Sequence, residues 1–586
     1  MKITMPWAKV SGATPHDSSS AFPTPAEMAE IAPTREERLF LLLSIFIGII
    51  SGLLVVSFRM AIEWLKLLLL GSAPHPGQIR LVIVPCAVGL VVAVLTRYVF
   101  PNVRGSGVNQ TKAALYIHNG YISIRTVMGK FLLSALAIGG GHSLGPEDPS
   151  LQIGAGVASM ISRRLGLSRE RLRIFAPVGA AAGLAAAFNA PISAILFVIE
   201  EVIGQWSAAV LGSIVLSAVS SVVVARWFWG AEPMFRIPSV TLRDPRELLA
   251  YAVLGLFGGL ASLLFAKALA YLRPRLYRQS DRARMLQPAI AGFLVGGIGY
   301  FGFPQVMGPG YEVIDQAMHA QFAWKILLVL ALLKIVATTL SFSSGTPGGM
   351  FAPTLFIGAM LGAAVGSFEK LFFPHLTGSV GSYALVGMGV LFAAFLRAPL
   401  TSVFMVLEVS GNYSIILPVI LANTIAYLLS RSLQPIPIFE VLTHQDGLSL
   451  PSMEELRDES NLSLEDAMQP VNVPVMEGSG TLADLSMSDE IKTAAAVLIH
   501  CEDGLWYAAK PHEIQSWLAV SSTGASSLED HLGTERVPVL YPDLPLQSAL
   551  SYFGRWPLLP ITNRARAGAI EGVISLEDAL KCFQHR

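Results

Sequence analysis

The feature that most constrains this chain is the run from Leu39 to Phe58, which contains no charged side chain. A helix over such a run spans ~30 Å, which is enough to cross the hydrocarbon core of a bilayer. Further apolar runs follow at 81–96, 206–225, 248–266, 286–303, 352–368 and 415–430. The sequence therefore predicts a polytopic membrane protein, with the lipid bilayer as the solvent for most of its surface.

Composition supports this prediction and excludes other classes of protein. Only 14% of the 586 residues are charged, which is too few to cover the surface of a soluble enzyme of this length. Lys plus Arg and Asp plus Glu are equal at 41 each, and a nucleic-acid partner is not expected without a basic excess. The three cysteines, at 86, 501 and 582, have no metal-ligand spacing, so we expect neither a disulfide scaffold nor a metal site.

The composition also changes along the chain. Residues 1–35 contain no long apolar run and are predicted to be a disordered cytoplasmic lead rather than a signal peptide. Residues 36–440 form the predicted transmembrane core. From 441 to 586, 30 of 146 residues are charged and 21 of these are acidic. We therefore predict a linker at 441–462 and a separate soluble domain at 463–586.

Two segments of the predicted core occur twice. The matching pairs are 190–200 with 398–408, at an offset of 208, and 149–155 with 353–359, at an offset of 204. Two matches in the same order are difficult to obtain by chance, although low-complexity membrane sequence is the alternative explanation. The repeat predicts two halves, 36–230 and 245–440, with the substrate site at their interface near the membrane midplane.

Several segments are predicted to be helices that begin or end inside the membrane. The apolar stretches 131–161, 179–199 and 387–407 are interrupted by glycine or proline, which indicates broken helices whose ends face a cavity. The sequences at 145–149 (GPEDP) and 349–353 (GMFAP) combine glycine with a following proline, as at the start of a helix. Because a helix N-terminus has free N–H groups and about half a positive charge, both are predicted to bind an anion.

These segments resemble the anion-site motifs of the CLC family of chloride channels and chloride/proton exchangers, usually G-S-G-I-P, G-K/R-E-G-P and G-x-F-x-P. In this chain the three motifs are GSGVN at 105–109, GPEDP at 145–149 and GMFAP at 349–353. The resemblance implies an all-α membrane core of broken helices in two inverted halves, and a homodimer with one pathway in each subunit. We expect a multi-pass protein of the cell (inner) membrane with both termini in the cytoplasm.

The resemblance also assigns anion-binding residues. It implies that Ser106, beside Gly107, offers its hydroxyl to a dehydrated chloride, and that the backbone N–H groups of Met350 and Phe351 donate to the same ion. Phe439 stands where the family usually has a tyrosine whose hydroxyl contacts the anion. The loss of one hydrogen bond to an ion is worth about 1.5–3 kcal/mol, so we expect weaker binding or looser proton coupling.

Two acids and one lysine receive roles in gating and proton transfer from the same resemblance. Glu147 corresponds to the gating glutamate, whose ionised carboxylate competes with the anion and withdraws when protonated. Glu201 corresponds to the inner glutamate that passes protons to the cytoplasm, and Lys130 to a buried lysine that sets the potential around the pathway. The alternatives are that Glu147 only stabilises a helix dipole and that Glu201 lies at a helix end on the cytoplasmic boundary.

Besides Phe439, three residues depart from the family pattern. Asp148 replaces a glycine and is expected to add a negative charge near the outer mouth of the pathway. Pro146 replaces a basic residue and removes a positive charge from the same place. Asn109 replaces a proline, which changes the geometry expected after Ser106.

Because Glu147 and Glu201 are both present, we predict exchange of chloride for protons, with a passive chloride channel as the alternative. A remote alternative from another class is an intramembrane serine hydrolase, since Gly141 to Gly145 matches G-x-S-x-G around Ser143. That motif requires a strand before the serine, whereas 131–140 is predicted to be the end of a helix. We therefore predict a transporter and not an enzyme.

The soluble domain resembles a pair of CBS modules, which implies an α/β domain with a dimerising or regulatory role. The segment 463–475 resembles the opening of the first module, and 546–550, 558–561 and 572–578 resemble the second. Ser575 and Asp578 match a Ser/Thr-x-x-Asp ending that can hold the ribose of an adenine nucleotide, and no other cofactor is expected. The alternative is that Ser575 caps the last helix, with Asp578 in its first turn.

Overall fold

The computed structural model describes residues 35–586 except for 73, 168, 205–207, 236–243, 376–377, 455, 457–461, 472, 482–495, 502–504, 521–526, 534–535, 539, 565–568 and 585–586. Residues 1–34 of the predicted N-terminal lead lie outside the described residues. The chain divides into two compact units, Met1–Leu450 and Pro451–Arg586. Each unit is described by itself.

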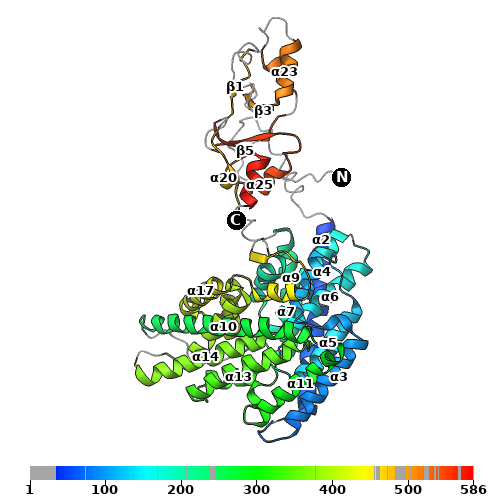
Figure 1. Cartoon of the computed structure of the whole chain (residues 1–586), viewed down its shortest axis with the longest axis vertical. Helices are drawn as coiled ribbons and strands as arrows, with labels where there is room; N and C mark the ends of the chain where they lie inside the picture. The colour runs from blue at the N-terminus through cyan, green and yellow to red at the C-terminus, as the bar shows by residue number, and fades with distance from the viewer. Residues whose placement is uncertain are drawn as a thin grey trace. The chain divides into compact units, whose positions relative to one another are not determined.

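The first unit consists of helices, coloured blue to yellow in Figure 1. Its first half contains α2 (Arg35–Leu69), α3 (Arg80–Tyr98), η2 (Pro101–Val103), α4 (Val108–Tyr116), α5 (Ile124–Gly139), α6 (Glu147–Arg164), α7 (Arg169–Phe188), α8 (Pro191–Phe197), the π-helical η3 (Val198–Ile203) and α9 (Ala208–Trp229). The second half contains α10 (Glu247–Tyr277), α11 (Asp281–Tyr300), η4 (Pro304–Val306), α12 (Tyr311–Met318), α13 (Trp324–Ser343), α14 (Phe351–Phe372), α15 (Val380–Leu396), α16 (Pro399–Ser410), η5 (Tyr413–Ile415), α17 (Ile416–Leu433) and α18 (Ile438–Gln445). The predicted helical core is confirmed.

Eight helices among the described residues are long and apolar enough to cross a membrane. They are α2, α3, α7, α9, α10, α13, α14 and the helical stretch Tyr413–Gln445. Six of the seven runs found in the sequence fall on these spans, in α2, α3, α9, α10, α14 and α17. The run 286–303 lies on α11, which is not one of the eight, and two candidate spans, α7 and α13, were missed. Lys334 interrupts the apolar run of α13, and α7 begins with several arginines.

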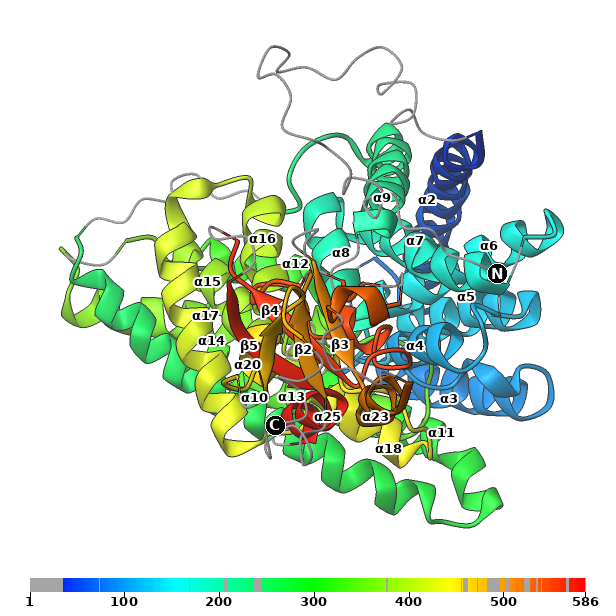
Figure 2. The same ribbon diagram turned by 90° about the horizontal axis from the view of Figure 1, so that it is seen from above.

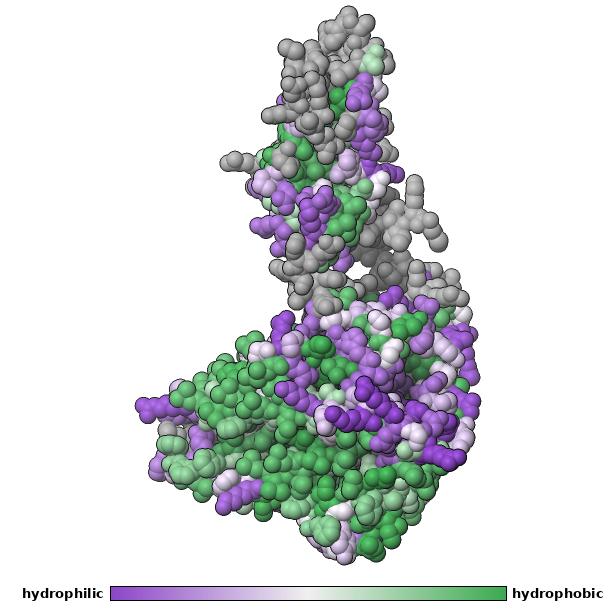
Figure 3. All heavy atoms as spheres, in the orientation of Figure 1, coloured by the Kyte–Doolittle hydropathy of each residue, from purple (hydrophilic) through white to green (hydrophobic). Residues whose placement is uncertain are grey.

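The outer surface of the helical unit is apolar over large areas. Figure 3 shows hydrophobic side chains covering the face formed by α10, α13 and α14. On α10, for example, Leu249, Phe257 and Leu260 are exposed. A protein in water rarely exposes an apolar surface of this extent, so this surface fits a lipid environment.

Each of the three interrupted stretches contains a break between two helices, as predicted. Gly140 to Pro146 separates α5 from α6. Asn189 and Arg397, both with positive φ (56° and 61°), lie between α7 and α8 and between α15 and α16. Pro191 and Pro399 then begin α8 and α16 at N1, the position where proline's missing N–H is not needed.

The two halves contact each other through reciprocal helix caps. The carboxylate of Glu200 accepts hydrogen bonds from the backbone N–H groups of Leu400 (3.2 Å) and Thr401 (2.9 Å) at the start of α16. The carboxylate of Glu408 accepts from Ile192 (2.9 Å) and Ser193 (2.8 Å) at the start of α8. These repeat-related acids therefore stabilise each other's half.

Figures 1 and 2 show the halves side by side, blue to cyan and green to yellow, with α11 beside α3. Glycines allow this contact. A Cβ atom on Gly292 of α11 would lie 2.1 Å from the Pro85 carbonyl oxygen of α3.

Glycines also allow α6 to pack closely on α7. A Cβ atom on Gly154 would lie 2.1 Å from the Gly179 carbonyl oxygen, and the repeat-related Gly358 would meet Gly387 at 2.2 Å. We expect Gly154→Ala to destabilise the protein by at least about 1–3 kcal/mol, because the helix backbones must separate. The measurement is thermal unfolding in detergent. The control is Gly297→Ala in α11, which meets nothing within 4 Å and should be neutral or slightly stabilising.

The second unit combines strands and helices. Its elements are α20 (Leu464–Ala467), β1 (Val475–Glu477), β2 (Val497–His500), β3 (Trp506–Ala509), α23 (Pro511–Val520), η6 (Glu529–His531), α24 (Gln547–Leu550), β4 (Leu558–Thr562), β5 (Ile570–Ser575) and α25 (Leu576–Gln584). β1 pairs in parallel with β2, and β2 pairs antiparallel with β3. β4 and β5 form an antiparallel pair, and Gln469 bridges to Val573 of β5. Buried side chains from both sheets form one apolar core.

Candidate anion site and proton-transfer residues

The first turns of α6 and α14 meet in the interior of the helical unit. The loops that precede them are joined by two backbone hydrogen bonds, from Gly145 N–H to the Gly349 carbonyl (2.8 Å) and from Gly349 N–H to the Gly145 carbonyl (2.7 Å). The two glycines are equivalent positions of the sequence repeat. The positive ends of two helix dipoles therefore lie together in a buried place, which favours a negative charge there.

Glu147 is the first residue of α6 and its side chain is fully buried. One carboxylate oxygen accepts a hydrogen bond from the backbone N–H of Ala352 in α14, at 3.3 Å. The other accepts a hydrogen bond from the hydroxyl of Tyr311, the first residue of α12. Glu147 thus faces the α14 N-terminus and not the outer surface, and a buried acid in a membrane-spanning unit is a candidate functional residue.

Asp148 is also fully buried. Its carboxylate accepts a hydrogen bond from the backbone N–H of Met350, at 2.9 Å, and interacts with the N–H of Phe351. These N–H groups are the ones assigned to the anion in the sequence. The two adjacent acids of α6 therefore contact successive residues at the start of α14.

The loop before α4 packs against the first turn of α6. Gly107 has a φ of 126°, and a Cβ atom there would lie 2.5 Å from the Asp148 carbonyl oxygen, so only glycine fits this approach. The neighbouring Ser106 is buried at 3% exposure, and its hydroxyl accepts a hydrogen bond from Val108 N–H at 3.3 Å. The structure therefore brings Ser106 and Gly107 to the α6 start.

Aromatic side chains surround the other predicted anion ligands. The Phe351 ring packs against Phe188, Phe197 and Phe392, with centroid distances of 6.2, 4.8 and 5.3 Å. Phe439, in α18, is fully buried. Its backbone carbonyl accepts a hydrogen bond from the Asn109 side chain at 2.8 Å. Asn109, where the family has proline, thus fastens α4 to α18.

Glu201 lies in the π-helical turn η3 and is only 3% exposed, so it does not lie at an exposed helix end. Its carboxylate forms an ion pair with Lys112 of α4, whose side chain is 6% exposed. The Lys112 ammonium also lies 5.6 Å from the centroid of the Phe439 ring. A buried carboxylate in this apolar region therefore has a matched cation, which its burial requires.

Two buried lysines occupy equivalent positions in the two halves. Lys130 of α5 donates to the carbonyls of Val103 (3.1 Å) and Gly105 (2.7 Å). Lys334 of α13 donates to the carbonyls of Val306 (3.0 Å) and Gly308 (2.6 Å). Both ammonium groups therefore hold the loop that leads into a neighbouring helix, and both add positive potential near the buried acids.

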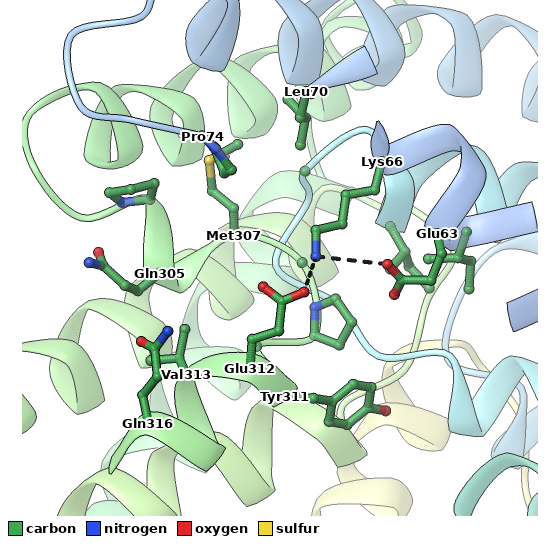
Figure 4. Close-up of a pocket in the computed structure, with 17 residues that line it drawn as sticks. Glu63, Lys66, Leu70, Pro74, Gln305, Met307, Tyr311, Glu312, Val313 and Gln316 are labelled. Atoms are coloured by element: carbon green, nitrogen blue, oxygen red, sulfur yellow. Dashed lines mark hydrogen bonds and ion pairs between the residues drawn. The ribbon is translucent and has the colours of Figure 1, made fainter. Parts of the chain in front are cut away.

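Cavities approach Glu147 from the side of Tyr311. One cavity of about 330 Å³, drawn in Figure 4, is lined by Tyr311, Glu312 and Lys66, among others. Lys66 forms ion pairs with Glu312 (2.8 Å) and Glu63 (3.8 Å), and Figure 4 shows it pointing between the two acids. A second cavity, of about 720 Å³, is lined by Tyr311 and Arg59. Tyr311 thus links the buried Glu147 carboxylate to space that water can reach.

The Ser143 alternative lacks the geometry of a hydrolase. The helix α5 precedes it, not a strand, and a strand-to-helix turn is what exposes a nucleophile of this motif. Its hydroxyl is fully buried and pairs with the Thr338 hydroxyl at 3.0 Å. The neighbouring His142 points its Nε2 at the Pro85 carbonyl, 3.2 Å away. Ser143 therefore has a packing role.

In the second unit, Ser575 and Asp578 form a helix cap. The Asp578 carboxylate accepts from the Ser575 N–H (3.1 Å) and hydroxyl (2.5 Å), while Asp578 N–H donates to the Ser575 hydroxyl (3.2 Å). Ser463 and Asp466 make the same arrangement at α20. This supports the capping alternative, and nucleotide binding at Ser575 and Asp578 stays a prediction. Among the described residues, no group of His, Cys, Asp and Glu could hold a metal ion.

Sequence reasoning missed three residues of this site. Lys112 gave no signal, because only the fold brings it to Glu201, 89 residues away. Lys334 could have been found, since the repeat relates its position to that of Lys130. Tyr311 follows a G-P-G sequence at 308–310, which indicates a turn but not its contact with Glu147.

Comparison with known proteins decides the family. A family model described as voltage gated chloride channel matches residues 88–431, more than half of the chain. The chain belongs to this CLC family. The H(+)/Cl(−) exchange transporter ClcA of Salmonella arizonae is 31% identical over 414 residues, covering 69% of this chain and 87% of the relative. The protein of the same name from Vibrio cholerae serotype O1 is 32% identical over 423 residues, covering 69% of this chain and 89% of the relative.

Solved CLC structures have the same fold. A slow cyanobacterial Cl−/H+ antiporter has a TM-score of 0.64 at 26% identity, covering 70% of this chain and 97% of that chain. A eukaryotic CLC transporter has a TM-score of 0.60 at 20% identity, covering 92% of this chain and 97% of that chain. The match to the eukaryotic transporter covers more of this chain than the first unit, which ends at Leu450, contains. The similarity in fold to that transporter therefore extends into the second unit.

Proposed function

We propose that this CLC protein exchanges chloride for protons across a membrane. The observation that carries the proposal is the fully buried carboxylate of Glu147 on the N-terminus of α14, with its other oxygen on Tyr311. When ionised, this carboxylate accepts the hydrogen bond of the Ala352 N–H group, a donor at the helix start that a transported anion needs. When protonated, it loses its charge and its attraction to the helix dipole falls, so an anion can replace it. The names of the ClcA relatives, H(+)/Cl(−) exchange transporters, support this function.

The anion ligands in this proposal are Ser106, with Gly107 beside it, the N–H groups of Met350 and Phe351, and the inner aromatic residue Phe439. Burial of these residues supports the assignment, because a dehydrated anion requires donors that water does not already use. Phe439 has no hydroxyl to donate. The Lys112 ammonium beside its ring supplies positive charge on that side of the site instead.

Protons reach Glu147 from one side through Tyr311 and from the other by way of Glu201. Glu201 is buried and ionically paired with Lys112, so its proton uptake requires that this pair loosen. This feature favours the second candidate function, a passive chloride channel, because a glutamate held by a lysine transfers protons less readily than an unpaired one.

We also infer that the protein is a homodimer in the lipid of the cell (inner) membrane, with both termini in the cytoplasm. The exposed apolar side chains of Val223 in α9 and Leu417 in α17 suit contact with lipid or with a second subunit. We propose that the second unit is a pair of CBS-like modules with a regulatory role. Its parallel and antiparallel strand pairs and its two Ser-x-x-Asp caps support this.

The test is a flux assay with purified protein in liposomes, using a chloride electrode and a pH electrode together. We expect chloride flowing down its gradient to drive protons in the opposite direction against theirs. Chloride flux without proton movement at any pH would establish the channel alternative, and no chloride flux would reject both. Ser143→Ala serves as the control variant and should transport like the wild type.

A further inference from the structure

The start of α14 is occupied by two carboxylates and not by one. Glu147 accepts from Ala352 N–H at 3.3 Å, and Asp148 accepts from Met350 N–H at 2.9 Å. Both acids are fully buried. Glutamate with its longer side chain and aspartate with its shorter one therefore reach different donors of the same helix end.

The surroundings of Asp148 are shaped to hold its carboxylate at this place. A Cβ atom on Gly349 would lie 2.8 Å from the Asp148 carboxyl carbon, so the glycine before α14 leaves the space that the carboxyl fills. The other side of the residue is covered by Gly107, through its contact with the Asp148 carbonyl. Asp148 thus packs between the loop that contains Ser106 and the loop that contains Met350.

The carboxylate of Asp148 is only partly satisfied there. Its second oxygen, Oδ1, is buried without a hydrogen-bond partner, and an unsatisfied buried acceptor costs free energy, more so when it is charged. Lys130 of α5 interacts with Asp148 electrostatically, and it donates hydrogen bonds to two backbone carbonyls and not to the Asp148 carboxylate. An ion held this way can be displaced or neutralised without the loss of a complete hydrogen-bond network.

We propose that Asp148 is a second gating carboxylate, which when ionised occupies the Met350 N–H that the transported anion requires. The inference rests on the proposed function. One N–H group cannot donate fully to a carboxylate and to a chloride at once, so the anion must replace both acids in turn. Protonation of Asp148 removes the competing charge and frees the donor, which makes anion passage depend on two ionisations in adjacent residues.

Other titratable groups lie close to Asp148 and Glu147, and the test must separate their effects from that of Asp148. Glu147 lies on the same helix, Lys130 on α5, and Tyr311 on α12. Arg59 of α2 and Lys334 of α13 interact electrostatically with Glu147. Any of these could make flux depend on pH, so the test first removes Glu147 and then compares variants that differ only at Asp148.

The test measures chloride efflux from liposomes between pH 4.5 and pH 8 for the wild type, for Glu147→Gln alone, and for Glu147→Gln combined with Asp148→Asn or with Asp148→Gly. For Glu147→Gln alone we expect efflux to fall as pH rises, by up to about tenfold per pH unit, the limit for a single ionisation. For both double variants we expect rapid efflux with little pH dependence. Asparagine keeps the shape of the side chain and glycine removes it, and the retained efflux itself reports a folded protein.

Three results are informative in different ways. Efflux of Glu147→Gln that does not change with pH overturns the role of Asp148 but leaves the proposed function intact. A pH dependence that survives in the double variants assigns the titration to Lys130 or another neighbour and also overturns it. Absence of chloride efflux from the wild type at every pH would instead reject the proposed function.

Discussion

Glu147→Gln is expected to stop proton transport while chloride transport continues. Glutamine has nearly the shape of glutamate and can still accept from Ala352 N–H, but it cannot bind and release a proton. It also carries no charge with which to compete for the N-terminus of α14. Proton flux driven by a chloride gradient should therefore fall to the level of empty liposomes, and chloride flux should persist with a pH dependence set by Asp148.

The control for this variant is Glu312→Gln. Glu312 lines the same cavity next to Tyr311, but it is 77% exposed and paired with Lys66. Loss of a carboxylate from this exposed position should leave the coupling of chloride to protons unchanged. If Glu147→Gln still moved protons against their gradient, Glu147 would not be the proton carrier of this pathway.

The second large effect is expected from the buried pair of Lys112 and Glu201. Removal of one partner of a buried ion pair typically costs about 3–5 kcal/mol, because the remaining charge is left in an apolar region. We expect Lys112→Met and Glu201→Gln each to lower the unfolding temperature in detergent. The double variant should regain most of that stability, because it leaves no buried charge behind.

Function should not follow stability in this series. The double variant, like Glu201→Gln, has no titratable acid at position 201, so chloride-driven proton flux should be lost in both. The control for stability is Arg97→Met, which breaks an ion pair with Asp281 at the surface, where the two side chains are 43% and 54% exposed. The loss of such an exposed pair is expected to lower the free energy of unfolding by only about 0–1 kcal/mol. A loss for Lys112→Met no greater than for Arg97→Met would show that Lys112 does not compensate a buried carboxylate.

The sequence by itself determined those features that are encoded in neighbouring residues. Uncharged runs long enough to cross a bilayer predicted α2, α3, α9, α10 and other helices, and proline and glycine predicted the breaks before α6, α8 and α16. The two pairs of repeated segments predicted two related halves. These predictions succeeded because helix length, helix starts and apolar surface depend on local composition and on the solvent.

Only the tertiary structure decided which of the buried charges meet. It placed the Asp148 carboxylate on the backbone N–H of Met350, paired Lys112 with Glu201, and brought Tyr311 to Glu147. It also showed that Glu200 and Glu408 cap each other's half. The partners in these contacts are 89 to 216 residues apart, and no local rule relates them. The distances between the charged groups are fixed by how closely the glycine-lined helices pack. In an apolar interior these distances decide whether a buried acid can remain ionised.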